Sequence, residues 1–449
     1  MIGHKLAIGA LSAGLLIGGW SITTESAAPS SSSTSPVPAV ASAAPVDQPV
    51  AGLAPIDEVV ALWQERVDTQ PFDYLSRTQL GAAFSQRGRE RADLDDHERA
   101  EAAHRDALRL NPSHTAARLG LAQALVAQHR FEEGRVLASQ LLAEEPSSLA
   151  AMALLGDTHL ELGDYDEASM LYSGLVEREP SAAATSRLAR LASIQTTPIE
   201  AVGLAEEALT LSRTEGLRPN QQAFYRYQVG HYRFEAGDTD GAIAAFDAAL
   251  DLDPAHPAAT EELAHTLAAT GEADRALALY DRMVTDGPAP DLHGRYAELL
   301  AATGQEAAAA EQEALGEALA AETLDRYPAE RRHLVEFHLG RDPETAVALS
   351  ERDLDERADV GAYDTLAWAL FHAGRIEEAA VAIDQALAQG TQAAPLRYHA
   401  AAIAAAARDR AEALAHLEVA LTLNPRFDVF DGPAALALYT ELAGKPFGT

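Results

Sequence analysis

One stretch decides the fold of this chain: LAAMALLGDTHLELGDYDEASMLYSGLVEREP, residues 149–180. Its apolar residues recur at steps of three and four, which predicts two amphipathic helices. Gly163 interrupts the pattern, because a residue without Cβ can end a helix and turn the chain. Asp164 is placed to cap the second helix. Gly156 and Ala168 are small, so we expect the two antiparallel helices to approach closely there.

The same features return with a period of 34 residues. Pro112, Pro146 and Pro180 are each 34 apart, and so are Gly237 and Gly271. Self-similarity at this period is typical of helix-turn-helix units that stack into a solenoid. The sequence therefore predicts an all-α, right-handed superhelical solenoid of about nine to ten repeats over residues 56–425. A C-terminal capping helix and tail should follow over residues 426–449.

Three units depart from the regular pattern. We expect a longer turn over residues 87–95 and a turn built on Thr197 and Pro198, where the glycine is missing. Over residues 305–327 a long helix rich in alanine and glutamate should replace the usual second helix. The repeat is therefore expected to be irregular at these three places.

The small-residue and turn positions resemble those of the tetratricopeptide repeat. One unit carries them as Gly237, Ala242, Phe246, Ala249 and Pro254. Other segments, taken in order, resemble a group of exported bacterial tetratricopeptide-repeat proteins of unassigned role: SRTQLG (76–81), LGD (155–157), TLAWAL (365–370), AGR (373–375) and LNPRF (423–427). This resemblance implies a repeat fold and a location outside the cytoplasm, and it implies no catalytic residue.

The N-terminus has the pattern of an export signal. A weakly basic start is followed by an apolar run over residues 6–22 and then by small residues. Residues 1–28 are therefore predicted to be a signal peptide or an N-terminal anchor, and we favour cleavage. Residues 29–55 consist mainly of Ala, Ser, Pro and Val, which predicts a disordered linker. We expect an exported protein that is periplasmic, at the cell surface or secreted.

Charge and cysteine content exclude several classes of function. The formal net charge is −34, and so acidic a surface repels nucleic-acid phosphates. The charge is open to two interpretations: attraction of a basic partner, or solubility in a saline habitat. The chain has no cysteine, which excludes disulfides and thiolate metal sites. Membrane contact is expected only if the N-terminal helix stays uncleaved.

No catalytic or cofactor motif was found in the sequence. The phosphate-binding loop, the dinucleotide fingerprint, the nucleophile elbow and the HExxH zinc motif do not occur. His97, Glu101 and His104 share one helix face, but a third strong metal ligand is missing, so we interpret these histidines as surface residues. We therefore predict no enzyme activity, no cofactor and no metal.

Aromatic residues are the best candidates for a binding site. In repeats of this kind, the second, fifth, ninth and twelfth positions of the first helix line the concave groove. Aromatic side chains there would be good anchors, because they offer large area and lose little entropy. The alternative is that several of them pack between helices. The candidate partner-binding residues are Phe224, Tyr227, His231, Phe234, Asp364, Trp368, Phe371 and Tyr398.

These observations together predict a non-enzymatic scaffold or adaptor outside the cytoplasmic membrane. It would hold a peptide or helix of a partner protein in its concave groove. One alternative is an accessory subunit of an envelope enzyme or transporter complex. A less favoured alternative is an enzyme whose site the sequence does not reveal.

Overall fold

The computed structural model describes residues 55–91, 93–286, 289–326 and 331–448. Within these ranges the chain forms helices and no strand. The predictions of a signal or anchor and of a linker fall almost entirely on residues 1–54, which lie outside the described residues. Among the helices of the described part, none has the length and apolar character needed to cross a membrane.

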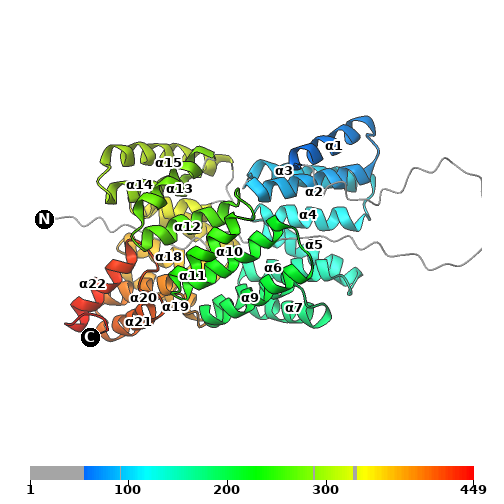
Figure 1. Ribbon diagram of the computed structural model, residues 1–449. Coiled ribbons are helices and arrows are strands. Elements are labelled where there is room, and N and C mark those ends of the chain that lie inside the picture. Colours follow the sequence, from blue (N-terminus) through cyan, green and yellow to red (C-terminus); the bar gives the residue numbers. More distant parts are fainter. Residues whose placement is uncertain (1–54, 92, 287–288, 327–330, 449) are drawn as a thin grey trace, which may run out of the picture.

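Within the described ranges, the helices form ten antiparallel pairs with one further helix at each end (Figure 1). The end helices are α1 (Ile56–Thr69) and α22 (Asp431–Ala443). The first helices of the pairs are α2 (Tyr74–Arg91), α4 (Thr115–Ala127), α6 (Leu149–Leu162), α8 (Ala182–Gln195), α10 (Pro219–Glu235), α12 (Pro257–Ala269), α14 (Pro290–Ala302), α16 (Arg331–His338), α18 (Val360–His372) and α20 (Ala394–Ala406). The second helices are α3 (Leu94–Leu110), α5 (Phe131–Glu144), α7 (Tyr165–Arg178), α9 (Pro198–Thr214), α11 (Thr239–Leu250), α13 (Ala273–Asp286), α15 (Glu306–Arg326), α17 (Pro343–Glu356), α19 (Ile376–Leu387) and α21 (Arg410–Leu423). This is the predicted all-α repeat superhelix.

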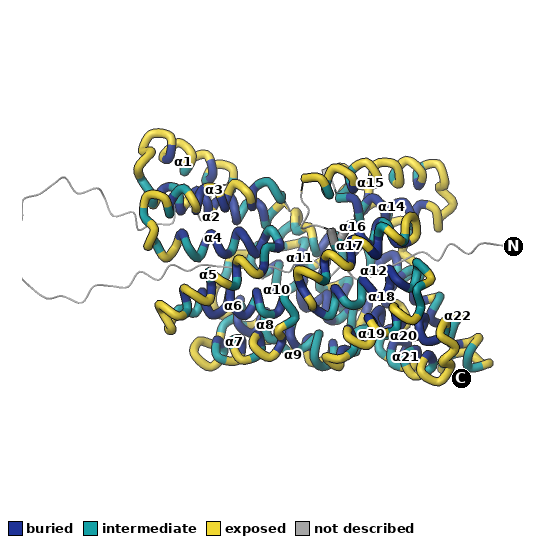
Figure 2. The backbone as a smooth tube through the Cα atoms, turned by 180° about the vertical axis from the view of Figure 1, so that it is seen from behind, coloured by how far each residue is buried: buried dark blue, intermediate teal, exposed yellow. Residues whose placement is uncertain are grey.

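The first helices form the inner layer of the superhelix. Each contacts the second helix of its own pair, and along most of the array consecutive first helices also contact each other. Figure 2 shows buried residues where helices face one another and exposed residues along outer helices such as α15. Burial is therefore shared between neighbouring pairs, because one pair cannot cover its own apolar face.

Glycines in the first helices make room for aromatic rings from the second helices. A Cβ at Gly156 would lie 2.7 Å from the ring of Tyr172, and a Cβ at Gly230 would lie 2.5 Å from the ring of Phe246. Ala168 on α7 is fully buried, as its small size predicted. The close approach of the two helices is therefore a packing requirement at the same position of both repeats.

Local details differ from the sequence predictions in two places. Asp164 does not cap α7; its carboxylate instead lies 3.0 Å from His159 Nδ1. The expected long turn over residues 87–95 is also wrong, because α2 continues to Arg91 and α3 begins at Leu94.

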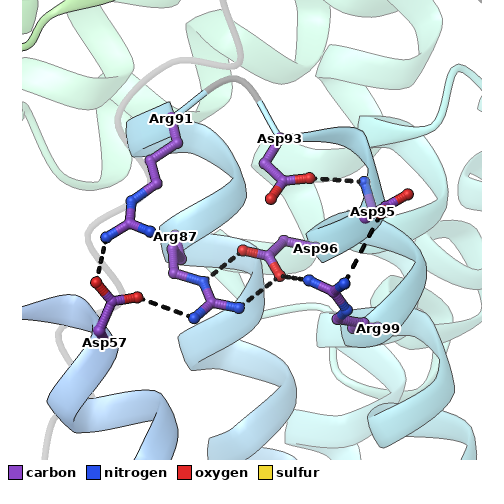
Figure 3. Close-up of polar contacts among 7 residues, drawn as sticks. All are labelled: Asp57, Arg87, Arg91, Asp93, Asp95, Asp96 and Arg99. Carbon is purple, nitrogen blue, oxygen red and sulfur yellow. Dashed lines mark hydrogen bonds and ion pairs between the residues drawn. The ribbon is translucent and has the colours of Figure 1, made fainter. Parts of the chain in front are cut away.

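The cause of the shorter turn is a set of ion pairs between the two helices (Figure 3). The carboxylate of Asp96, which is fully buried, accepts hydrogen bonds from Arg87 at 2.6 and 2.8 Å and from Arg99 at 2.8 Å. Arg87 on α2 and Arg99 on α3 both neutralise the buried carboxylate of Asp96. These ion pairs favour helical structure in α2 and α3 up to the short turn between them.

The other two irregular units agree with the prediction. Thr197 caps α9 and Pro198 occupies its first turn, so this helix begins without a preceding glycine turn. The long helix is α15, which has 21 residues.

The superhelix coils until its late repeats touch its early ones. The Val360 amide donates to the Tyr165 hydroxyl at 2.8 Å, across 195 residues of sequence. The Asn424 side chain donates to the Phe234 carbonyl at 2.7 Å, across 190 residues. Figure 1 shows the corresponding arrangement, with the C-terminal helices beside α10 to α12. The array is thus closed by direct contacts between distant turns.

Two turn glycines are positioned at these contacts. Gly163 and Gly237 have φ angles of 86° and 83°, as expected for helix-ending glycines. A Cβ at Gly163 would lie 2.4 Å from the Ala358 carbonyl oxygen, and a Cβ at Gly237 would lie 2.3 Å from the Leu423 carbonyl oxygen. Gly271 has the same role in its own repeat, with φ of 88°, but no atom lies within 4 Å of its Cβ position.

We predict that Gly237→Ala destabilises the protein more than Gly271→Ala does. Both changes place a Cβ at positive φ, which costs about 1 kcal/mol, but only the first also drives a Cβ into the backbone of a distant turn. Thermal denaturation followed by circular dichroism should show a clearly larger fall in Tm for Gly237→Ala. Equal falls for the two variants would contradict the closed coil.

Candidate functional site

The candidate aromatic residues on α10 are packed between repeats. Tyr227 is 3% exposed, and its ring lies 6.1 Å from Phe246 and 5.4 Å from His256. Phe234 is also buried and meets the ring of His265 edge-on at 5.2 Å. The predicted open aromatic surface on α10 is therefore not formed. These rings instead fill the space between α10, α11 and α12.

The candidates on α18 and α20 show the same arrangement. Trp368 is 3% exposed and stacks on His399 at 4.1 Å and on Phe371 at 4.8 Å. Tyr398 is buried beside the indole ring at 5.9 Å. The candidates that remain partly exposed are Phe224, Asp364 and Phe371. Partner binding at α10, α18 and α20 stays a prediction, but five of the eight side chains are buried, so they stabilise the repeat stack.

Charged side chains line the inner layer where aromatic rings were expected. Arg187 on α8 donates to Asp157 on α6 at 2.7 and 2.9 Å. One turn further along the same two helices, Arg190 lies 2.6 Å from Glu161. Each pair joins two consecutive first helices, so the inner face is held together by charge-assisted hydrogen bonds.

The ion pairs continue into the later repeats. His231 Nδ1 on α10 lies 3.2 Å from a carboxylate oxygen of Glu262 on α12. Arg295 on α14 donates to Glu261 on α12 at 2.9 Å and to Glu336 on α16 at 3.0 Å. The partners in these pairs are 31, 34 and 41 residues apart. Oppositely charged residues spaced about one repeat apart in the first helices were therefore the sequence signal that could have predicted the ion pairs of the inner layer.

Three carboxyl groups on this inner layer keep oxygen atoms without a partner. Glu235 and Glu262 each have one buried oxygen that accepts no hydrogen bond. Glu298, on the same face of α14 as Arg295, makes no ion pair or hydrogen bond with the described residues. We call Glu235, Glu262 and Glu298 the inner acidic face.

Burial perturbs the titration of this face. Burial raises the pKa of Glu298 to about 8, against the opposing effect of Arg341. Burial also raises the pKa of Glu235, although the His231 imidazolium opposes the shift. Burial lowers the pKa of His231, but the carboxylates of Glu235 and Glu262 outweigh it and raise the pKa to about 9. At neutral pH, His231 is thus charged and Glu298 is mostly protonated.

The histidines on α3 are not surface residues, contrary to the prediction. His97 and His104 are buried, and burial lowers the pKa of each to about 4. His104 lies between Gly81 and Gly120, where a Cβ would meet its ring. Glu101 is engaged by Arg130 at 2.8 Å. Over the described ranges, no group of three possible ligands is arranged to hold a metal ion.

We predict that Glu298→Gln changes how stability depends on pH. An ordinary glutamate in the unfolded chain titrates near 4.5, whereas Glu298 in the folded chain titrates near 8. Folding therefore takes up a proton between these values, and this group destabilises the fold progressively as pH rises from about 5 to 8. At pH 9 the variant should be more stable than the wild type by on the order of 1–3 kcal/mol, and at pH 5 the two should be similar.

Denaturation midpoints at pH 5, 7 and 9 measure this difference. Glu207→Gln is the matched control, because Glu207 is exposed on α9 and the charge change is the same. If the midpoints of Glu298→Gln and wild type change with pH in the same way, Glu298 titrates as an ordinary glutamate and its pKa is not raised.

Comparison with known proteins places the repeats in a family. The sequence model of the tetratricopeptide repeat matches residues 92–141, 128–191 and 233–293. No curated protein matches the chain.

Several solved structures are similar to parts of the chain. Human IFIT1, in a structure of its dimer with PPP-AAAA, is 16% identical, with 75% of this chain and 77% of that chain covered and a TM-score of 0.48. A tetratricopeptide repeat protein from Parabacteroides merdae is 16% identical, with coverage of 53% and 93% and a TM-score of 0.38. PilF of Pseudomonas aeruginosa is 18% identical, with coverage of 50% and 95% and a TM-score of 0.38.

The family assignment rests on the agreement of sequence and fold. The family matches fall within the array of paired helices, whose turn glycines recur every 34 residues. The glycine-to-aromatic contact recurs at the same position in the pairs α6–α7 and α10–α11. Residues 92–191 and 233–293 belong to the tetratricopeptide-repeat family.

Proposed function

We propose that this protein is a non-catalytic scaffold that holds a basic segment of a partner protein against the inner acidic face. Tetratricopeptide repeats are scaffolds for protein–protein interaction and are generally not catalytic. The observation that carries the proposal is Glu298 of the inner acidic face, which is partly exposed and has no hydrogen-bond or ion-pair partner among the described residues. A guanidinium or ammonium group of a partner would supply the missing hydrogen-bond donors.

The charge of the surroundings supports a basic partner. Glu298 lies near Glu336 and Asp428 as well as near Arg295 and Arg341. Glu298 itself makes no ion pair with these neighbours within the described residues, and the whole protein carries a net charge of −34. The same charge disfavours a nucleic-acid partner. The acidic surface thus attracts cationic segments over a distance before any direct contact forms.

The location of this scaffold is also a proposal. The apolar run over residues 6–22, followed by small residues, supports export to the periplasm, the cell surface or the medium. A chain without cysteine is compatible with an oxidising compartment, because it has no thiol to oxidise. The partner is then expected to be another extracytoplasmic protein.

We predict that binding of a basic probe strengthens as pH rises from 6 to 9. A cation binds the ionised form of Glu298 better than the protonated form, so affinity follows ionisation of this group near pH 8. The probe is a labelled peptide with three arginines, compared by fluorescence anisotropy with a peptide that carries three glutamates instead. Glu298→Gln should weaken arginine-peptide binding about tenfold at pH 9 and flatten its pH dependence.

The control is again Glu207→Gln, which should bind the arginine peptide as the wild type does. Equal affinity for the arginine and glutamate peptides would rule out the inner acidic face as a binding surface. Should the acidic face be confirmed, capture from solubilised envelope with wild type and Glu298→Gln, followed by mass spectrometry, would identify the natural partner as the protein lost from the variant.

A further inference from the structure

A small cavity lies near the beginning of the superhelix, away from the inner acidic face. Its volume is about 10 Å³. It is lined by residues from α2, α3, α4 and α6: Ser85, Arg89, His97, Gln123, Val126, Ala127 and Leu154. A cavity of this size accommodates about one water-sized group.

Three of the residues that line this cavity have a buried polar atom without a hydrogen-bond partner. Ser85 and His97 are each 6% exposed, and in the part of the chain that the structure describes neither Ser85 Oγ nor His97 Nδ1 has a hydrogen-bond partner. The buried Nε2 atom of Gln123 also lacks a partner. Leaving a buried polar atom unpaired costs about 1–3 kcal/mol. Three such atoms around one cavity therefore point to a group that binds there.

The packing of His97 fixes its position in the wall. A Cβ at Gly88 would lie 2.9 Å from Cε1 and 3.1 Å from Nδ1 of the His97 ring. The ring therefore packs directly on the backbone of α2, one turn from Ser85. Burial, with a further contribution from Arg89, lowers the pKa of His97 to about 4, so the imidazole is neutral at physiological pH.

Arg89 gives the cavity its charge. Its neighbours on α2, Arg87 and Arg91, both pair with Asp57 on α1 (Figure 3). Arg89 has no carboxylate partner among the described residues, and burial lowers the pKa of its guanidinium to about 10. The adjacent Glu90 instead accepts a hydrogen bond from Gln86 at 2.8 Å. Arg89 is thus a partly exposed cation without a carboxylate partner in the described part of the chain, which has twice as many acids as bases.

We infer that one oxygen of a carboxylate occupies this cavity, close to Ser85, Gln123 and His97, while the other oxygen stays at its mouth beside the partly exposed Arg89 guanidinium. Hydroxyl, amide and guanidinium groups all supply donors, and the planar guanidinium matches the two oxygens of a carboxylate. Ser85 and His97 are buried whereas Arg89 and Gln123 are partly exposed, so the carboxylate enters past Arg89. The carboxylate belongs either to an acidic or C-terminal residue of a partner or to a free small acid.

This site is independent of the proposed function. It lies on α2 to α6, whereas the inner acidic face lies on α10 to α14, and it takes a ligand of the opposite charge. If basic peptides do not bind, the proposed function is contradicted but the carboxylate site is not. If acetate does not bind, the carboxylate site is contradicted but the proposed function is not.

The test is a titration of the full chain with sodium acetate at constant ionic strength, with acetamide as the uncharged analogue of the same shape. Thermal denaturation and the ¹⁵N signals of labelled histidine rings are followed together. Acetate should raise Tm saturably and shift the His97 ring signals, and acetamide should do neither. Arg89→Gln should weaken acetate binding at least tenfold, whereas the control Arg91→Gln should bind as the wild type does.

Two peptides then distinguish the sources of the carboxylate. One carries a single glutamate and an amidated C-terminus, and the other carries a free C-terminal carboxylate and no acidic side chain. Competition by either peptide assigns the site to a partner, and binding of acetate alone assigns it to a free small acid. Equal effects of acetate and acetamide, no saturable effect of acetate, or full acetate binding in Arg89→Gln would overturn the inference. Ser85→Ala provides a second variant if Arg89→Gln does not fold.

Discussion

Each helix pair of this protein has apolar side chains that it cannot cover alone, and the rest of the structure follows from this constraint. The pairs must stack, so the surface between consecutive first helices becomes the core of the molecule. The largest rings are placed there. Tyr227 packs against Phe246 of its own pair and His256 of the next, and Trp368 is covered by His399. Most of these aromatic side chains therefore pack between helix pairs, and little aromatic surface is left for a partner.

Stacking also decides the shape of the molecule. A small rotation at each pair turns the array into a coil, and after enough pairs the late turns meet the early ones. The contacts Tyr165–Val360 and Phe234–Asn424 are hydrogen bonds that involve backbone atoms, and they occur where turn glycines allow close approach. A coil closed in this way holds its inner layer at a fixed spacing.

The constant spacing of the inner layer explains why its first helices can be joined by ion pairs. Ion pairs such as Arg187–Asp157 need two helices at constant separation, because charge-assisted hydrogen bonds depend on short distances. Where the pairing is complete, the charges hold the layer together. Where it is incomplete, at Glu298 on the inner acidic face and at Arg89 near the cavity, the chain keeps polar groups that a ligand of the opposite charge would satisfy. We propose these two places as an acidic and a basic binding site on one superhelix.

The sequence by itself determined the repeat. The 34-residue period, the turn glycines and the small residues such as Gly156 specify paired helices locally, because helix ends and close helix contacts depend on residues near in sequence. It also predicted the irregular units at Thr197 and at α15. It failed at residues 87–95, where ion pairs to the buried carboxylate of Asp96 extend both helices to the turn.

Only the tertiary structure decided which side chains are accessible. A position in the repeat predicts that Tyr227 and Trp368 point toward the inner layer, but their burial depends on the residues that neighbouring pairs bring against them. In the same way, no local pattern shows that Ser85, His97 and Gln123 meet at one cavity or that Gly237 touches Leu423. These contacts arise from the accumulated rotation of many pairs, which a repeat motif of about 34 residues does not encode by itself.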